Sequence, residues 1–270
     1  MMVFFSVCME TYNRGKTIYD AILSVKNQTF KDYEVIIVDN ASTDNTVSEI
    51  NRALKYCEDK ALFLHTSMFN YVFIRNTEHL SGQRNWNEPL KHATGEYIVI
   101  LEGDDMFKSG HLKRAYSVIK HGLDTHDVIL GFYATGNQIN KKEISGIFDS
   151  KEIFDLLYTI HNLSPPSETI FINKYRFNVD DFIYYPEVDL LLRIASDGYC
   201  AYYDDNQNVI RGMSTSDRRR YRWVYYTDAY TLLEKYRGQA GERLYRKTLL
   251  KVIYRDVKLK VQEFLRELIR

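Results

Sequence analysis

Residues 33–46 read YEVIIVDNASTDNT. The run from Tyr33 to Val38 is almost entirely apolar, and short polar side chains follow it from Asp39 onward. A short apolar run that ends in polar residues is typical of a strand buried in a parallel sheet. Thr43 or Asp44 can then cap a helix that runs to about Cys57. The stretch therefore predicts a strand, a polar loop and a helix, which is the repeating unit of α/β proteins.

The same unit recurs on both sides of this stretch. Apolar runs at 3–9, 71–75 and 96–101 predict three more strands, and residues 16–27 and 82–93 have helical spacing. This order predicts an α/β fold with a doubly wound sheet, in which ligands bind at the carboxyl ends of the strands. Polar clusters stand at those ends, at 10–14, 39–44 and 102–105.

Composition excludes several classes of protein. The chain has 270 residues, with 36 basic and 36 acidic side chains, and this zero net charge argues against a dedicated nucleic-acid binder. No Gly-x-Gly-x-x-Gly and no Walker loop occurs, which disfavours dehydrogenases and P-loop NTPases. Three scattered cysteines predict buried thiols in a reducing compartment. No apolar run approaches the ~20 residues of a spanning helix, so we expect a cytoplasmic protein, or one peripheral to the inner face of a membrane.

The segment Glu102-Gly103-Asp104-Asp105 carries the clearest chemistry. Several carboxylates at the end of a buried strand repel one another unless a cation joins them. Oxygen ligands favour Mg²⁺ or Mn²⁺, which in turn hold a diphosphate. The alternative is a surface acidic turn that caps a helix starting near Ser109.

Taken together, the motifs resemble the inverting family-two glycosyltransferases of the GT-A fold. Five segments carry the resemblance over about residues 3–108, in the family's order and spacing: SVCMETYNR (6–14), AILSVKNQTF (21–30), YEVIIVDNASTDNT (33–46), GQRN (82–85) with ATGEYI (93–98), and EGDD (102–105). The resemblance implies a GT-A fold with a mixed doubly wound sheet. It also implies a metal-dependent enzyme that moves a sugar from a nucleoside diphosphate donor, with UDP favoured, to a hydroxyl of a glycan or lipid-linked acceptor.

The resemblance also assigns roles to single residues. Asp39 would hydrogen-bond the nucleotide base, and Thr11 and Tyr12 would line its pocket. Arg84 would lie near the nucleotide. Glu102 stands where the family contacts ribose or a metal-bound water, and Asp104 would ligate Mn²⁺ or Mg²⁺, so Glu102 and Asp104 are the expected metal residues.

An inverting transferase also needs a carboxylate that takes the proton of the acceptor hydroxyl. The segment YPEVDLLLRIASDGY (185–199) resembles the family's corresponding motif, and in that register Glu187 takes the position of the base. Asp189 is the other candidate. The alternative reading is that both acidic residues only face the positive end of a helix dipole.

Five positions depart from the family pattern. Glu10 replaces a proline, Asn40 replaces an aspartate, and Glu102 and Glu187 each replace an aspartate with the longer acid. Met213 stands at or near a histidine that often adds a metal ligand. These substitutions motivate a rival hypothesis, a catalytically inactive relative that binds a nucleotide sugar or a glycan. A nucleotidyltransferase is a third option, but the glycine-rich phosphate loop it needs is missing.

The C-terminal part differs in charge from the rest. Residues 217–270 contain 15 Lys and Arg against 7 Asp and Glu, so the zero net charge is a cancellation between an acidic first part and a basic tail. We therefore expect a glycosyltransferase domain over 1–213 and a tail of two amphipathic helices over 214–270, joined near Gly238 and Gly241. The apolar stripe of the second helix would run through Tyr245, Leu249, Ile253, Val257, Val261, Phe264 and Leu268. The stripe could contact a membrane surface, pack on a second copy, or pack on the chain's own catalytic domain.

Overall fold

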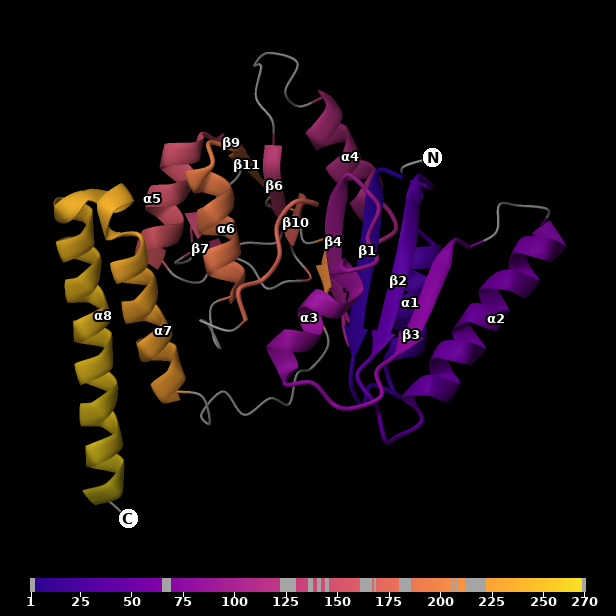
Figure 1. Ribbon diagram of the computed structural model, residues 1–270, viewed down its shortest axis with the longest axis horizontal. Helices are drawn as coiled ribbons and strands as arrows, with labels where there is room; N and C mark the ends of the chain where they lie inside the picture. The colour runs from indigo at the N-terminus through magenta and orange to yellow at the C-terminus, as the bar shows by residue number, and fades with distance from the viewer. Residues whose placement is uncertain are drawn as a thin grey trace.

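The computed structural model describes residues 3–64, 69–121, 130–135, 138–139, 142–143, 146–160, 167, 169–179, 186–204, 206, 208–211 and 222–268. An eight-stranded sheet in the order β3-β2-β1-β4-β10-β6-β11-β9 forms the centre of the molecule (Figure 1). Its first half consists of β1 (Phe5–Thr11), β2 (Tyr33–Asp39), β3 (Tyr71–Arg75) and β4 (Tyr97–Glu102), which pair in parallel. These strands occupy the four apolar runs at 3–9, 33–38, 71–75 and 96–101, as the sequence predicts.

The second half of the sheet introduces the antiparallel pairs. Strand β10 (Thr169–Ile172) lies between β4 and β6 (Leu130–Thr135) and runs antiparallel to both. Strand β11 (Cys200–Asp204) is parallel to β6, and β9 (Gly146–Phe148) closes this edge antiparallel to β11. The sheet is therefore mixed, as expected. Two short pairs lie outside it: β5 (Met106–Phe107) with β12 (Val209–Ile210), and β7 (Gln138–Ile139) with β8 (Lys142–Glu143).

Helices cover both faces of the sheet because its strands are apolar on both faces. Along β1, Val7 and Met9 belong to one core cluster and Cys8 to the other, as the two-residue period of a strand requires. One cluster includes α1 (Ile18–Lys26), α2 (Thr46–Leu64) and α4 (His111–His121). The other includes α3 (Gly82–Leu90), α5 (Ser150–Ile160) and α6 (Pro186–Ser196). Helix α2 continues seven residues beyond its expected end near Cys57.

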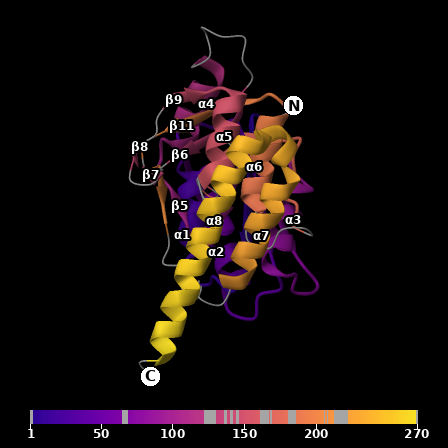
Figure 2. The ribbon, with the colours of Figure 1, turned by 90° about the vertical axis from the view of Figure 1, so that its left-hand side faces the viewer.

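Two helices complete the chain, as the sequence predicts. They are α7 (Arg222–Lys235) and α8 (Arg237–Leu268), and Gly241 interrupts the second with a left-handed φ of 75°. They lie side by side on the outer side of α5 and α6 (Figures 1 and 2). Leu232, Leu233 and Tyr236 are buried in the same cluster as α5 and α6. Of the helices that the structure describes, none combines the length and apolar character needed to cross a membrane.

Candidate active site

The polar residues at the strand ends meet at one edge of the sheet. Strand β1 is central, with β2 on one side and β4 on the other. The register pairs Thr11 with Asp39 across β1 and β2, and Glu10 with Glu102 across β1 and β4. The fold therefore brings the predicted base-binding residues and the predicted metal residues to adjacent positions.

Asp39 is a fully buried carboxylate at the end of β2. Its Oδ2 accepts a hydrogen bond from the backbone N–H of Ser42 at 3.1 Å and lies 3.3 Å from Nε of Arg75. The intervening Ala41 adopts a left-handed φ of 58°, which turns the chain back toward the strand end. Within the described residues, Oδ1 of Asp39 has no hydrogen-bond partner. A buried acceptor in this state can receive a donor from a ligand.

Thr11 and Tyr12 occupy the end of β1. Thr11 is 1% exposed, and its hydroxyl has no hydrogen-bond partner among the described residues. A Cβ on Gly103 would lie only 2.6 Å from that hydroxyl, so only glycine allows the loop after β4 to approach β1 this closely. The ring of Tyr12 is 38% exposed and lies 4.1 Å from the ring of His79, centroid to centroid. Arg84 is an exposed residue in the first turn of α3.

Asn40, which departs from the family pattern, makes contacts that no local sequence signal predicts. The Asn40 side chain donates to the backbone oxygen of Leu80 and accepts from the backbone N–H of Leu80, both at 2.9 Å. Its backbone oxygen lies 3.3 Å from Nδ1 of His79. An aspartate could accept but could not donate in this arrangement. The hydrogen bonds of Asn40 therefore hold the loop that contains His79 and Leu80, and this loop places His79 beside Tyr12.

A chain of amides connects this loop to the acidic cluster. Nδ2 of Asn76 donates to Oδ1 of Asn40 at 3.1 Å and to Oδ1 of Asn85 at 3.2 Å. Asn85 in turn donates to Oε2 of Glu10 at 3.0 Å. No spacing rule in the sequence links these three asparagines, because they come from the ends of β2, β3 and α3. The loop after β2 and the carboxylate of Glu10 are thus parts of one hydrogen-bonded unit.

Four carboxylates gather around the end of β4. Burial, together with the nearby Glu10, Asp105 and Asp104, raises the pKa of Glu102 to about 8. Burial also raises the pKa of Glu10 above its usual value. One guanidinium nitrogen of Arg14 lies 3.3 Å from Oδ2 of Asp104. Like charges in a buried site disfavour ionisation, and a cation bound there would reverse this effect.

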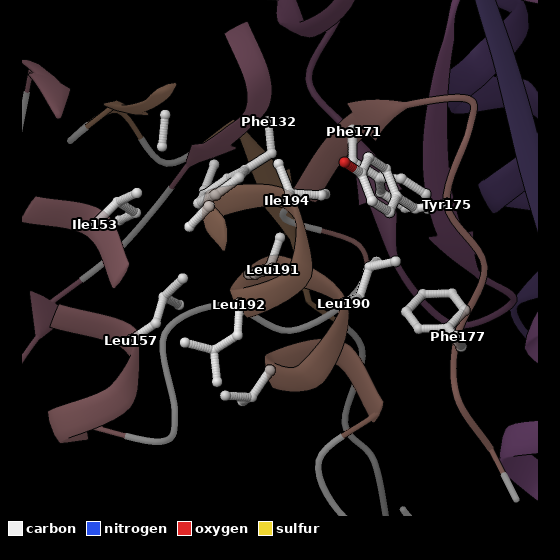
Figure 3. Close-up of a cluster of buried hydrophobic side chains, with 14 of the residues drawn as sticks. Phe132, Ile153, Leu157, Phe171, Tyr175, Phe177, Leu190, Leu191, Leu192 and Ile194 are labelled. Carbon is white, nitrogen blue, oxygen red and sulfur yellow. The ribbon is translucent and has the colours of Figure 1, made fainter. Parts of the chain in front are cut away.

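Glu187 is the second residue of α6, at its positive end. It lines a small, mostly apolar cavity with Ile100, Thr169, Phe171, Phe177, Leu190 and Leu191. Figure 3 shows the apolar side chains of this region, including Phe171, Phe177 and Leu190. Burial raises the pKa of Glu187 to about 8, and Oε2 lacks a hydrogen-bond partner within the described part of the chain.

The cavity lies close to the acidic cluster. Ile100 precedes Glu102 by two residues and so shares its face of β4. On the neighbouring segment, the hydroxyl of Ser167 accepts a hydrogen bond from the backbone N–H of Glu102 at 3.0 Å. Thr169, two residues after Ser167, lines the cavity together with Glu187.

Asp189 has a different environment from Glu187, although only two residues separate them. Its carboxylate is fully buried, and Arg193 donates to Oδ2 at 2.9 Å. Lys235 and Tyr236 donate to Oδ1 at 2.6 and 2.7 Å. Both oxygens are thus occupied by side chains from α6 and from the α7–α8 junction. Met213, the position of the expected additional metal ligand, lies outside the described residues.

Solved structures share this fold. The crystal structure of Staphylococcus aureus TarS superposes with a TM-score of 0.64 at 17% identity, covering 93% of this chain and 43% of that one. TarS 1–349 in complex with UDP gives a TM-score of 0.57 at 18% identity over 85% of this chain and 65% of that one. The mannosyltransferase PcManGT from Pyrobaculum calidifontis, in complex with GDP-Man and Mn²⁺, gives 0.61 at 18% identity, covering 87% and 64%.

Sequence comparison identifies the family. A Campylobacter jejuni protein, GalNAc(5)-diNAcBac-PP-undecaprenol beta-1,3-glucosyltransferase, is 34% identical over 108 residues, which is 40% of this chain and 31% of that protein. The chain spans about half the length, or less, of the curated relatives it matches. The family model described as glycosyl transferase family 2 matches residues 6–176. This match covers more than half of the chain, which therefore belongs to glycosyl transferase family 2.

Proposed function

We propose that this chain is a metal-dependent inverting glycosyltransferase. It moves a sugar from a nucleoside diphosphate donor, with UDP as the nucleotide, to a hydroxyl of a glycan or a lipid-linked acceptor. The observation that carries the proposal is the placement of Glu187. Its carboxylate, whose Oε2 has no hydrogen-bond partner among the described residues, lines a cavity with Ile100, beside the strand end that bears Glu102 and Asp104. A relative named as a beta-1,3-glucosyltransferase and the solved structure of TarS 1–349 in complex with UDP support the same class of reaction.

In this proposal the nucleotide binds across the ends of β1 and β2. The free Oδ1 of Asp39 accepts a hydrogen bond from the base, and the Thr11 hydroxyl supplies a second polar contact. Tyr12, with His79 against it, offers an aromatic face to the base. We place Arg84 near the nucleotide, from the first turn of α3.

Glu102 and Asp104 would hold Mn²⁺ or Mg²⁺. Their oxygens are the ligand type these cations prefer, and the crowding of carboxylates that raises the pKa of Glu102 favours a cation. Across the described residues, no three His, Cys, Asp or Glu side chains form a metal cage. A site with two protein carboxylates fits a cation that also binds substrate phosphates. When bound, the cation neutralises the charge that develops on the departing diphosphate.

Glu187 acts as the general base. Its carboxylate takes the proton of the acceptor hydroxyl while that oxygen bonds to the anomeric carbon. The bond from that carbon to the diphosphate breaks in the same step, so the anomeric configuration inverts. We do not give this role to Asp189, because both of its oxygens already accept hydrogen bonds from cationic or phenolic donors.

We propose a cytoplasmic location, because Cys8, Cys57 and Cys200 are all buried free thiols, as proteins of a reducing compartment tolerate. The C-terminal helices would provide any peripheral membrane contact or self-association. We propose no role in nucleic-acid binding, since the proposed ligand contacts are made by acidic, hydroxyl and aromatic side chains.

UDP release tests the proposal. Asp104→Ala should abolish turnover and the Mn²⁺-dependent part of donor binding. Asp59→Ala, which removes an exposed carboxylate on α2, should leave both unchanged and serves as the matched control. A chain that binds nucleotide sugars but never releases the nucleoside diphosphate would instead be an inactive family member that binds a nucleotide sugar or a glycan.

A further inference from the structure

Helix α8 carries two apolar faces. The inner face contains Tyr245 and Val252, which are buried in the core cluster, and Leu249 packs against the same cluster. Among the side chains that the structure describes, the outer face carries five exposed apolar ones: Leu250, Ile253, Tyr254, Val257 and Val261, which are 40–67% exposed. Leu250 and Val252 are two positions apart, about 200° around a helix, so the two faces point in nearly opposite directions.

The predicted single stripe is therefore split between two environments. Steps of four residues rotate by about 40° around a helix, so a series of such steps winds around the axis. Tyr245 at the start of the stripe faces the core, whereas Val257 and Val261 are exposed. Helices α5 and α7 thus cover the beginning of the stripe, and the part that includes Val257 and Val261 is not covered by them.

Basic residues border the outer face. Lys247, Lys251, Arg255 and Lys258 are all exposed and lie along one side of it. The acidic Asp256 is only partly exposed and lies on the side nearer the core. The helix lies at one end of the molecule, and its C-terminal end extends beyond the other elements (Figures 1 and 2). A flat surface could therefore reach this face without obstruction from the sheet.

We propose that the outer face of α8, from Lys247 to Val261, docks on an anionic lipid bilayer. The apolar side chains would enter the boundary between headgroups and acyl chains, and the flanking Lys and Arg would contact lipid phosphates. The positive charge beside this face complements an anionic bilayer and does not complement a second copy of the chain. Pairing two such faces would bring Lys251 and Arg255 close to their equivalents with few acidic partners, which is unfavourable.

Vesicle flotation of the full chain tests the proposal. The chain should bind vesicles of phosphatidylcholine with 30% phosphatidylglycerol at least 10-fold more strongly than pure phosphatidylcholine vesicles at 0.1 M NaCl. Binding should fall steeply at 0.5 M NaCl because salt screens the attraction. These two measurements need no variant. Equal binding to both kinds of vesicle, or none, would overturn the proposal.

Paired variants locate the surface. Lys251→Gln/Arg255→Gln should weaken vesicle binding about 10-fold or more, because it removes two contacts with lipid phosphates. Leu250→Gln/Val257→Gln should weaken vesicle binding by a similar factor, because it removes apolar side chains that enter the bilayer. The matched controls are Lys55→Gln/Lys113→Gln and Leu62→Gln/Phe63→Gln, which change exposed residues on other helices. Controls that weaken binding as much as the α8 variants would contradict the assignment. So would a concentration-dependent dimer, seen by sedimentation velocity without vesicles, that the α8 variants abolish.

Vesicle binding and glycosyl transfer can be tested separately. UDP release measured with a water-soluble acceptor should be unchanged in the α8 variants, because the outer face of α8 carries none of the proposed catalytic residues. Failure of vesicle binding would leave the transferase proposal intact, and failure of turnover would leave the membrane proposal intact.

Discussion

The ammonium group of Lys235 lies 2.6 Å from Oδ1 of Asp189, a carboxylate with no exposed surface. The hydroxyl of Tyr236 donates to the same oxygen at 2.7 Å. This contact joins α6, which carries Glu187, to the junction of α7 and α8. The C-terminal helices therefore hold the element that positions the proposed base.

Asp189→Asn should destabilise the protein and leave the chemistry intact. The amide keeps the size of the side chain but removes the charge that Arg193 and Lys235 face. We expect the free energy of unfolding to fall by about 1.5–3 kcal/mol, the usual contribution of a hydrogen bond to a charged group. Urea denaturation measures this change. If instead the variant is stable and has lost turnover, Asp189 and not Glu187 is the base.

Glu187→Gln should lower kcat by roughly 10²–10⁴-fold, the usual contribution of a general base. Donor affinity, measured by calorimetry with UDP and Mn²⁺, should stay within about twofold of the original. Asp228→Asn, a neighbouring carboxylate that raises the pKa of Glu187, is the control and should retain most turnover. Normal turnover by Glu187→Gln would show that Glu187 is not the general base.

The raised pKa of Glu187 gives a pH dependence with a definite sign. Because the base must be ionised, kcat/KM should increase as pH rises toward about 8. Stability should change in the opposite direction. Between the ordinary pKa of 4.5 and about 8, the folded chain keeps a proton that the unfolded chain releases, so stability falls as pH rises. Thermal melts at pH 5 and pH 9 should show a smaller loss for Glu187→Gln than for the original chain.

Asn40→Asp tests the loop that borders the proposed base pocket. Aspartate cannot donate to the backbone oxygen of Leu80, and it adds a charge beside that oxygen. Loss of one hydrogen bond of ~1 kcal/mol should raise the Kd of UDP about fivefold, with little change in kcat. Asn51→Asp adds the same charge on the exposed side of α2 and should leave the Kd unchanged. Equal effects of both variants would mean that added charge, not the lost contact, is responsible.

Truncation after residue 213 should produce an aggregating protein. It removes Leu232, Leu233 and Tyr236, which are 0–5% exposed and belong to the same core cluster as α5 and α6. Light scattering and binding of a hydrophobic dye measure the outcome. A truncation after Lys258 keeps the buried Tyr245 and Val252 and should remain folded. A monomeric, cooperatively melting 1–213 fragment would instead support a separate domain with that boundary.

The sequence by itself determined the first half of the fold and the polar residues that gather at one edge of its sheet. Short apolar runs followed by polar residues depend only on local order, so β1 to β4 and the polar residues at their ends were predicted correctly. Strand β10 was not predicted. It has only four residues, and neither it nor its neighbouring segments show a clear periodicity of apolar residues. Its position next to β4 follows from the packing of the whole sheet.

Tertiary structure decided how chemically similar residues differ. Glu187 and Asp189 are both acids in the first turn of α6, and only the register of the family motif favours Glu187 over Asp189 as the base. Only the approach of Lys235 and Tyr236, more than forty positions away, occupies one carboxylate and leaves the other in an apolar cavity. Asn40 became a positioning residue in the same way, through a loop that starts after the next strand. Contacts between distant segments set burial and hydrogen bonding, and these in turn decide which side chains remain available for a ligand.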